Sequence, residues 1–141
     1  MPAAHGTARP LTGMGTGSMA LDLLTGAAAA HFSGHLSPLG ADTGHGNLTV
    51  TLTGGSTFSY TGTRTFVVAN GDKVFSNITG KGTLTRTGTN ATETDPITGG
   101  TGPFAGASAT YTATIHNAVV SSAAGWQTSR VTAAAHGQIR S

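Results

Sequence analysis

Hydrophobic and polar residues alternate along much of the chain with a period of two. The clearest run covers residues 47–53, where Leu48, Val50 and Leu52 occupy one phase and threonines the other. In a β-strand, successive side chains point to opposite faces, so a period of two places each class of residue on its own face. The pattern therefore predicts strands with one apolar face and one threonine-bearing face.

Turn signals divide the chain into segments of strand length. Gly54-Gly55, Asn70-Gly71 and Gly88 are typical of hairpin turns, and a longer turn-rich stretch covers residues 38–46. Strands are predicted at 31–37, 47–53, 57–61, 64–69, 73–79, 83–87, 91–95, 106–116 and 126–139. Many strands with almost no helix predict an all-β fold, a barrel or a sandwich. We favour a small closed antiparallel β-barrel of about eight strands, because closure removes exposed edge strands.

The first thirty residues lack this alternation. Gly13, Gly15 and Gly17 lie in a loose polar stretch, and the more apolar residues 19–30 end in four alanines. Residues 19–30 are similar to the hydrophobic region and the small-residue cleavage site of a secretory signal, although Asp22 interrupts the apolar run. Two interpretations stay open: a degenerate signal-like segment, which favours a secreted or cell-envelope protein over a cytoplasmic one, or an N-terminal extension. Both place a single barrel domain at residues 31–141.

The composition excludes several classes of function. Charged residues make up 9% of the chain and the net charge is +2, whereas an ordinary soluble domain has about 25% charged residues. Nucleic-acid binding requires clustered cations, and the sequence has no such cluster. The chain has no cysteine, which excludes disulfides and thiolate metal sites. No apolar run has the length of a membrane-spanning helix. The 22 glycines are expected in turns.

Histidines are the remaining candidates for metal ligands. His31 and His35 lie four residues apart on a predicted strand, which separates them by about 13 Å, too far to share one ion. His45 falls in the predicted turn-rich stretch. No metal site is therefore predicted.

One segment resembles a known family. Residues Ile97–Ala107 read ITGGTGPFAGA, which resembles a segment of the allene oxide cyclases and their bacterial relatives; dirigent proteins carry a similar turn. We expect a positive φ for at least one of Gly99, Gly100 and Gly102 in this structural turn, and we expect Phe104 to seal one end of the core. The resemblance implies an eight-stranded barrel, association into a homotrimer, and cofactor-free cyclisation or isomerisation of an apolar small molecule.

The threonine phase predicts which residues point inward. If threonine faces water, the opposite phase fills the lumen; its apolar members are Leu48, Val50, Leu52, Phe58, Tyr60, Phe66, Val68, Leu84, Tyr111, Ala113 and Ile115. Four charged residues, Arg64, Arg86, Glu93 and Asp95, share this inner phase. An isolated buried charge is costly. These four therefore either form cross-strand pairs at the rim or make a polar cluster in an apolar cavity, with pKa values shifted toward acid–base chemistry.

Three hypotheses of function follow. The first is a cofactor-independent cyclase or isomerase; its catalytic candidates are Arg64, Arg86, Glu93, Asp95, Tyr60 and Tyr111. The second is a non-catalytic, secreted small-molecule-binding protein; in both, the ligand-binding candidates are Phe58, Tyr60, Phe66, Phe104 and Tyr111. The third is a scaffold protein with a solid core. A cavity of roughly 300 Å³ or more favours the first two. Ala109 and Ala113, on the predicted inner face, leave room for one.

Overall fold

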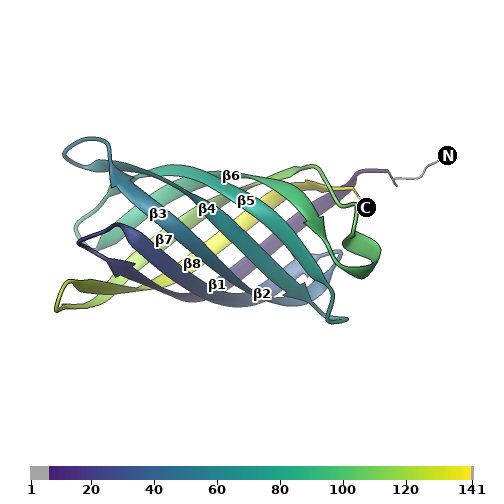
Figure 1. Ribbon diagram of the computed structural model, residues 1–141, viewed down its shortest axis with the longest axis horizontal. Coiled ribbons are helices and arrows are strands. Elements are labelled where there is room, and N and C mark those ends of the chain that lie inside the picture. The colour runs from purple at the N-terminus through teal and green to yellow at the C-terminus, as the bar shows by residue number, and fades with distance from the viewer. Residues whose placement is uncertain (1–6, 141) are drawn as a thin grey trace.

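Eight antiparallel strands pair in sequence order, and the last strand pairs with the first to close a barrel (Figure 1). A computed structural model describes residues 7–140 of the chain. The strands are β1 (Arg9–Asp22), β2 (Ala27–Ser37), β3 (Gly40–Leu52), β4 (Thr57–Val68), β5 (Lys73–Leu84), β6 (Gly88–Gly100), β7 (Thr110–Ala123) and β8 (Trp126–Ile139). The predicted fold class, a closed antiparallel barrel of eight strands, is confirmed.

The two ends of the barrel differ. Short loops joining β1 to β2, β3 to β4, β5 to β6 and β7 to β8 surround one end, which we call the mouth (left in Figure 1). The start of β1, the end of β8 and the β6–β7 connection lie at the other, closed end. That connection contains a short 3-10 helix, η2 (Gly102–Phe104). Within residues 7–140, no helix is long and apolar enough to cross a membrane.

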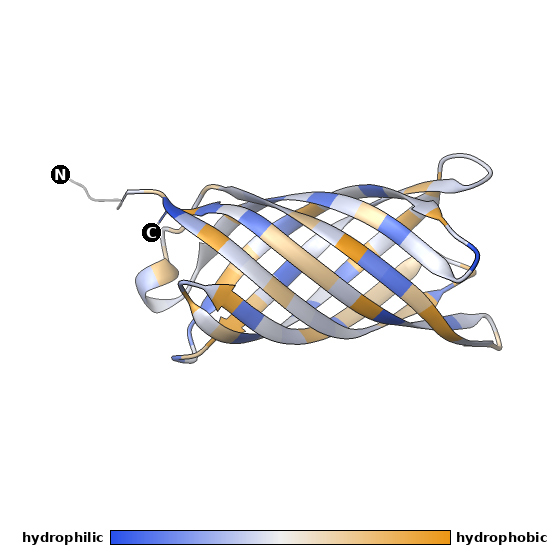
Figure 2. Ribbon diagram, turned by 180° about the vertical axis from the view of Figure 1, so that it is seen from behind, coloured by the Kyte–Doolittle hydropathy of each residue, from blue (hydrophilic) through white to orange (hydrophobic). Residues whose placement is uncertain are grey.

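The wall has the two faces that the alternation predicts. Residues of the threonine phase, such as Thr49 and Thr61, are exposed, whereas Val50 is half-buried and Tyr60 is buried. Blue, white and orange bands accordingly alternate along the strands in Figure 2. β-Branched threonine suits a pleated surface that meets water. The assignment of the threonine face to the outside is confirmed.

The barrel begins earlier in the sequence than expected. Residues 9–22 and 27–37 form β1 and β2, so the expectation that residues 1–30 lie outside a barrel of residues 31–141 is wrong for residues 9–30. Gly13, Gly15 and Gly17 occupy the inner phase of β1 and alternate with exposed residues, among them Thr12 and Thr16. Glycine and threonine differ little in hydropathy, so this alternation gives no apolar signal. Residues 1–6 lie outside the described residues.

Many glycines lie in strands, not in turns as expected. The inner phase of the barrel includes Gly44 and Gly80, and a β-carbon at either position would clash with an aromatic ring, that of Phe32 or Tyr60 respectively. An eight-stranded barrel has an interior just wide enough to be filled by side chains. Glycine on the inner face therefore makes room for large rings from neighbouring strands.

The closed end is a packed core. Phe104 projects from η2 into a cluster with Leu11, Val74, Ile97, Tyr111 and Ile139. In the turn, Gly102 has φ 56° and Gly99 has φ 150°, whereas Gly100 is not among the residues with positive φ. Both the expected positive φ and the expected sealing by Phe104 are confirmed.

Some strand boundaries differ from the prediction. The stretch 38–46, predicted to be rich in turns, largely belongs to β3. It resembles a turn in sequence because its inner positions, Asp42, Gly44 and Gly46, are polar or glycine. The predicted strand at 83–87 ends at Leu84, and residues 85–87 form the β5–β6 turn. The β7 strand starts at Thr110, not at Gly106.

Candidate functional site

A cavity of about 780 Å³ lies inside the barrel. Its apolar lining includes Leu48, Val50, Phe58, Phe66, Ala113 and Ile115. Leu23, Thr85 and Arg86 from the loops border the same cavity, so it reaches the mouth. This volume lies within the range of about 300–1,000 Å³ that is typical of small-molecule sites. It disfavours the hypothesis of a solid scaffold.

Charged side chains meet at the inner end of this cavity. Arg64 of β4 donates hydrogen bonds from Nη1 to Glu93 Oε1, 2.8 Å away, and to Asp95 Oδ2, 2.9 Å away. Its Nη2 donates to Glu93 Oε2 at 3.3 Å. Both carboxyl groups come from β6, two residues apart, and therefore point to the same side of the strand. We call Tyr60, Arg64, Glu93 and Asp95 the ion cluster.

Tyr60 completes the ion cluster from a second position on β4. Gly80 of β5 is paired with Tyr60 on one side and with Glu93 of β6 on the other. The Tyr60 ring lies across Gly80, and its hydroxyl donates to Glu93 Oε2 at 2.9 Å. A side chain on β5 would block this reach, so the glycine is part of the site.

The ion cluster is buried in the middle of the strands. The exposed fractions of the Arg64, Glu93 and Asp95 side chains are 10%, 2% and 0%. The predicted inward placement of these three residues, with an opposite-charge pair in salt-bridge reach, is confirmed. The rim interpretation is wrong for them, because alternation continues unbroken through the centres of β4 and β6.

The two carboxyl groups have different affinities for a proton. Burial, together with the neighbouring Glu93, raises the pKa of Asp95 to about 8. Burial would also raise the pKa of Glu93, but the Arg64 guanidinium and its hydrogen bonds hold that pKa below its ordinary value. At neutral pH, Asp95 therefore carries a proton while Glu93 is ionised and paired with Arg64. The ion cluster thus contains a carboxylic acid beside a carboxylate.

Two tyrosines supply neutral hydroxyl groups. Burial, and for Tyr60 the nearby Glu93 carboxylate, raises the pKa of Tyr60 and of Tyr111 above the ordinary tyrosine value. The Tyr111 hydroxyl lies 2.9 Å from Ser76 Oγ, beside the ion cluster. Both phenols therefore stay protonated and can act as hydrogen-bond donors at any physiological pH.

Some buried polar atoms have no protein partner within residues 7–140. They are Arg64 Nε, Asp95 Oδ1 and Asn117 Oδ1. An unsatisfied buried polar atom costs about 1–3 kcal/mol. Arg64 and Asn117 both border the cavity, so a ligand there could receive a hydrogen bond from Arg64 and donate one to Asn117.

The structure separates the candidate residues into groups. It brings Tyr60, Arg64, Glu93 and Asp95 together, and it places Phe58, Phe66 and Tyr111 around the cavity. Phe104 belongs to the closed-end core, so its prediction as a ligand contact is wrong. Arg86 borders the cavity at the mouth, within its predicted placement at the interior or the mouth, but its prediction as a strand residue is wrong: it is exposed in the β5–β6 turn, because β5 ends at Leu84. Ala113 lines the cavity, whereas Ala109 lies in the β6–β7 connection.

Sequence reasoning missed several polar or aromatic groups that border the cavity, among them Phe32, Asp42 and Asn117. Asp42 is 7% exposed, and burial raises the pKa of its carboxyl group, although His35 acts in the opposite direction. The Phe32 ring lies 5.4 Å from the Arg64 guanidinium carbon, a cation–π contact. Counting back from Leu48 in steps of two residues along β3 would have placed Asp42 on the inner face. Counting forward from Tyr111 in the same way along β7 would have placed Asn117 there.

The histidines of the described residues are exposed: His31, His35, His45, His116 and His136. His45 belongs to β3, not to a loop, and is paired with His31 of β2, with ring centroids 6.3 Å apart. Within the described residues, no group of three or more His, Asp or Glu side chains could hold a metal ion.

Comparisons with protein-family models, with curated proteins and with solved structures give no match. The resemblance of Ile97–Ala107 to allene oxide cyclases, and the homotrimer that it implies, therefore stay predictions.

Proposed function

We propose that the barrel binds a small molecule with an apolar body, which lies in the cavity with its polar end at the ion cluster. The cavity of about 780 Å³ carries this proposal. Leu48, Val50 and Ile115 would surround the apolar body, and Tyr60, Arg64 and Glu93 would face the polar end. Sites of this kind combine an apolar lining with a few fixed polar groups that orient the ligand.

Charge in the cavity favours a neutral or cationic polar end. Arg64 is the one buried cation among the described residues, and Glu93 already neutralises it. Asp42 adds a second carboxyl group to the lining. A ligand carboxylate at the ion cluster would meet this acidic surface, because the other cation that borders the cavity in the described residues, Arg86, lies at the mouth. Burying an unpaired charge is costly. We expect alcohols or amines to bind more tightly than acids of the same chain length.

Fluorescence of N-phenyl-1-naphthylamine, an apolar probe, tests this binding. Ala133 lines the cavity, whereas its neighbour Ala134 is exposed on the outer wall. Ala133→Phe should weaken probe binding at least tenfold, and Ala134→Phe should leave it unchanged. Decanol and decylamine should displace the probe at lower concentrations than decanoate. Equal binding by both variants, with unfolding temperatures showing that both are folded, would contradict the proposal.

A second candidate function is a cofactor-independent isomerase or cyclase, as the resemblance implies. The specific observation in its favour is the acid beside the base: Asp95 holds a proton where Glu93 is ionised. With a β,γ-unsaturated ketone, Glu93 would remove the α-proton and return it at the γ-carbon, while the Tyr60 hydroxyl moves its hydrogen bond from Glu93 Oε2 to the carbonyl oxygen. Ultraviolet absorbance of the conjugated product measures this step. Glu93→Gln should abolish it and preserve probe binding; no turnover by the unmodified protein would exclude this reaction.

A further inference from the structure

Exposed apolar side chains gather at the mouth. Of the nine large hydrophobic residues exposed in the described chain, seven lie on the loops and strand ends there. We call these seven the apolar collar: Leu23, Leu24, Leu52, Leu84, Val119, Val120 and Trp126. The other two, Met14 and Phe75, lie within β1 and β5 on the wall. Large exposed apolar patches mark interaction sites.

Backbone hydrogen bonds hold the apolar collar in a ring. Each mouth loop is joined to a neighbouring strand or loop at 2.8 Å; the pairs, donor first, are Leu23–Gly125, Val50–Gly26, Leu84–Ser56 and Val119–Thr87. Three of these four donors belong to the collar itself. The apolar side chains are therefore presented by one connected rim, not by independent loops.

The apolar collar continues the surface of the cavity. Leu23, Leu52 and Leu84 border the cavity, as does Val119. Leu24 and Val120 are 90% and 60% exposed and extend the apolar surface beyond the rim. Apolar side chains are thus available to an apolar molecule both at the rim and inside the cavity.

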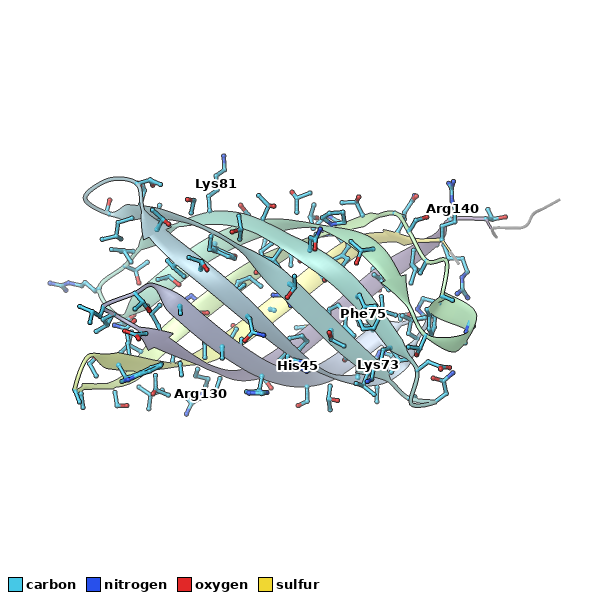
Figure 3. The ribbon with its side chains drawn as sticks, viewed as in Figure 1. His45, Lys73, Phe75, Lys81, Arg130 and Arg140 are labelled. Carbon is cyan, nitrogen blue, oxygen red and sulfur yellow. The ribbon has the colours of Figure 1, made fainter. Side chains whose placement is uncertain are left out.

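The charges around the mouth are mostly positive. Arg86 lies in the β5–β6 turn, and Lys81 and Arg130 project outward from the wall in the mouth half of the barrel, whereas Lys73 and Arg140 lie toward the closed end (Figure 3). Asp22 is the one acidic residue of the mouth loops and adjacent strand ends. Its carboxylate accepts hydrogen bonds from the backbone N–H groups of the β1–β2 loop at 2.9 and 3.3 Å.

We propose that the apolar collar docks the mouth on an anionic lipid bilayer, so that an amphiphile moves between bilayer and cavity without crossing water. Apolar side chains beside cations, with a tryptophan at the boundary, suit the interface of such a bilayer. The wall beyond the collar carries threonine and other polar residues, which limits insertion to the rim. The transfer of an amphiphile rests on the proposed function; the docking does not.

Vesicle flotation and Trp126 fluorescence test the docking. Trp126 is the one tryptophan in the chain and is 50% exposed in the collar. Vesicles of phosphatidylcholine with 30% phosphatidylglycerol should carry the protein upward and shift its emission to the blue. Pure phosphatidylcholine should bind at least tenfold less protein, and 0.5 M salt should weaken binding to the anionic vesicles. Leu24→Ser/Val120→Ser should reduce binding at least tenfold.

Met14→Ser is the matched control, because Met14 is 76% exposed on the wall outside the collar. It should bind vesicles like the unmodified protein. No flotation with anionic vesicles, or an equal loss with Met14→Ser, would overturn the docking. Sedimentation without lipid adds a further test: self-association lost in Leu24→Ser/Val120→Ser would instead make the collar an interface between copies. Probe binding without vesicles should persist in Leu24→Ser/Val120→Ser, so failure of the cavity and failure of docking are measured separately.

Discussion

The hydroxyl of Tyr60 reaches Glu93 across an intervening strand, and the hydrogen bond is 2.9 Å long. Gly80 lies between these two residues in the register of β4, β5 and β6. The same arrangement occurs at Gly44, where the Phe32 ring lies across the glycine and contacts the Phe66 ring. The centroids of these two rings are 5.4 Å apart. Aromatic rings lying over inner-face glycines therefore link strands that are not neighbours.

Gly80→Ala should displace the Tyr60 ring, because the added methyl group would occupy its position. Overpacking in a fitted interior costs about 1–3 kcal/mol of unfolding free energy. Urea denaturation measures the loss. Gly55→Ala, in a loop where a β-carbon meets nothing within 4 Å, is the control and should change stability little. If Gly80→Ala destabilises equally in a Tyr60→Ala background, the ring is not the cause.

Arg64→Met should destabilise the protein by about 3–5 kcal/mol, because Glu93 would remain buried as an unpaired charge. Replacing both carboxyl groups as well, in Arg64→Met/Glu93→Gln/Asp95→Asn, should restore much of the loss. Arg130→Met, at an exposed position, should change stability by less than about 0.5 kcal/mol. A single variant Arg64→Met as stable as the unmodified protein would mean that the ion pair contributes nothing to folding.

Sequence reasoning identified the fold and all four residues of the ion cluster for the same physical reason. A strand period of two fixes the face of every residue once one face is known, and threonine revealed the outer face. Arg64, Glu93 and Asp95 followed from that parity, because no bulge interrupts the central part of β4 or β6.

Prediction from the alternation was wrong where the inner-facing positions of a strand lacked apolar residues, or where a strand ended earlier than predicted. Gly13 and Gly15 made β1 look like a loop, and Gly44 with Asp42 did the same for the start of β3. Arg86 was assigned to a strand that stops at Leu84. The width of the cavity depends on how rings pack over glycines across several strands, which no local pattern reports.

Gly102→Val should lower the unfolding free energy by more than about 1 kcal/mol. Gly102 has φ 56°, a left-handed conformation that a β-branched residue adopts only with strain. A β-carbon would also come within 3.0 Å of the Asp72 carboxylate. Thermal unfolding measures the change, with Gly55→Val as the control in an open loop. Equal stability of the two variants would show that the turn tolerates a side chain at Gly102.

The protonated state of Asp95 should make stability depend on pH between about 4 and 8. Its pKa is about 8 in the folded protein and near 3.8 in an unfolded chain. Over this interval the folded state holds a proton that the unfolded state has lost, so stability is full at low pH and falls as pH rises toward 8. The slope approaches about 1.4 kcal/mol per pH unit. Glu93 has the opposite sign, because its pKa is lowered, and acts only below its ordinary value of 4.5.

Asp95→Asn isolates this effect, because asparagine mimics the neutral acid. The raised pKa of Asp42 adds a pH dependence of the same sign in both proteins, so the informative quantity is the difference in unfolding free energy between Asp95→Asn and the unmodified protein. Urea denaturation at a series of pH values should show the variant gaining relative stability as pH rises from 5 to 8. A difference that is constant over this range would mean that Asp95 ionises at its ordinary pKa. The acid–base pair on which the isomerase hypothesis depends would then be absent.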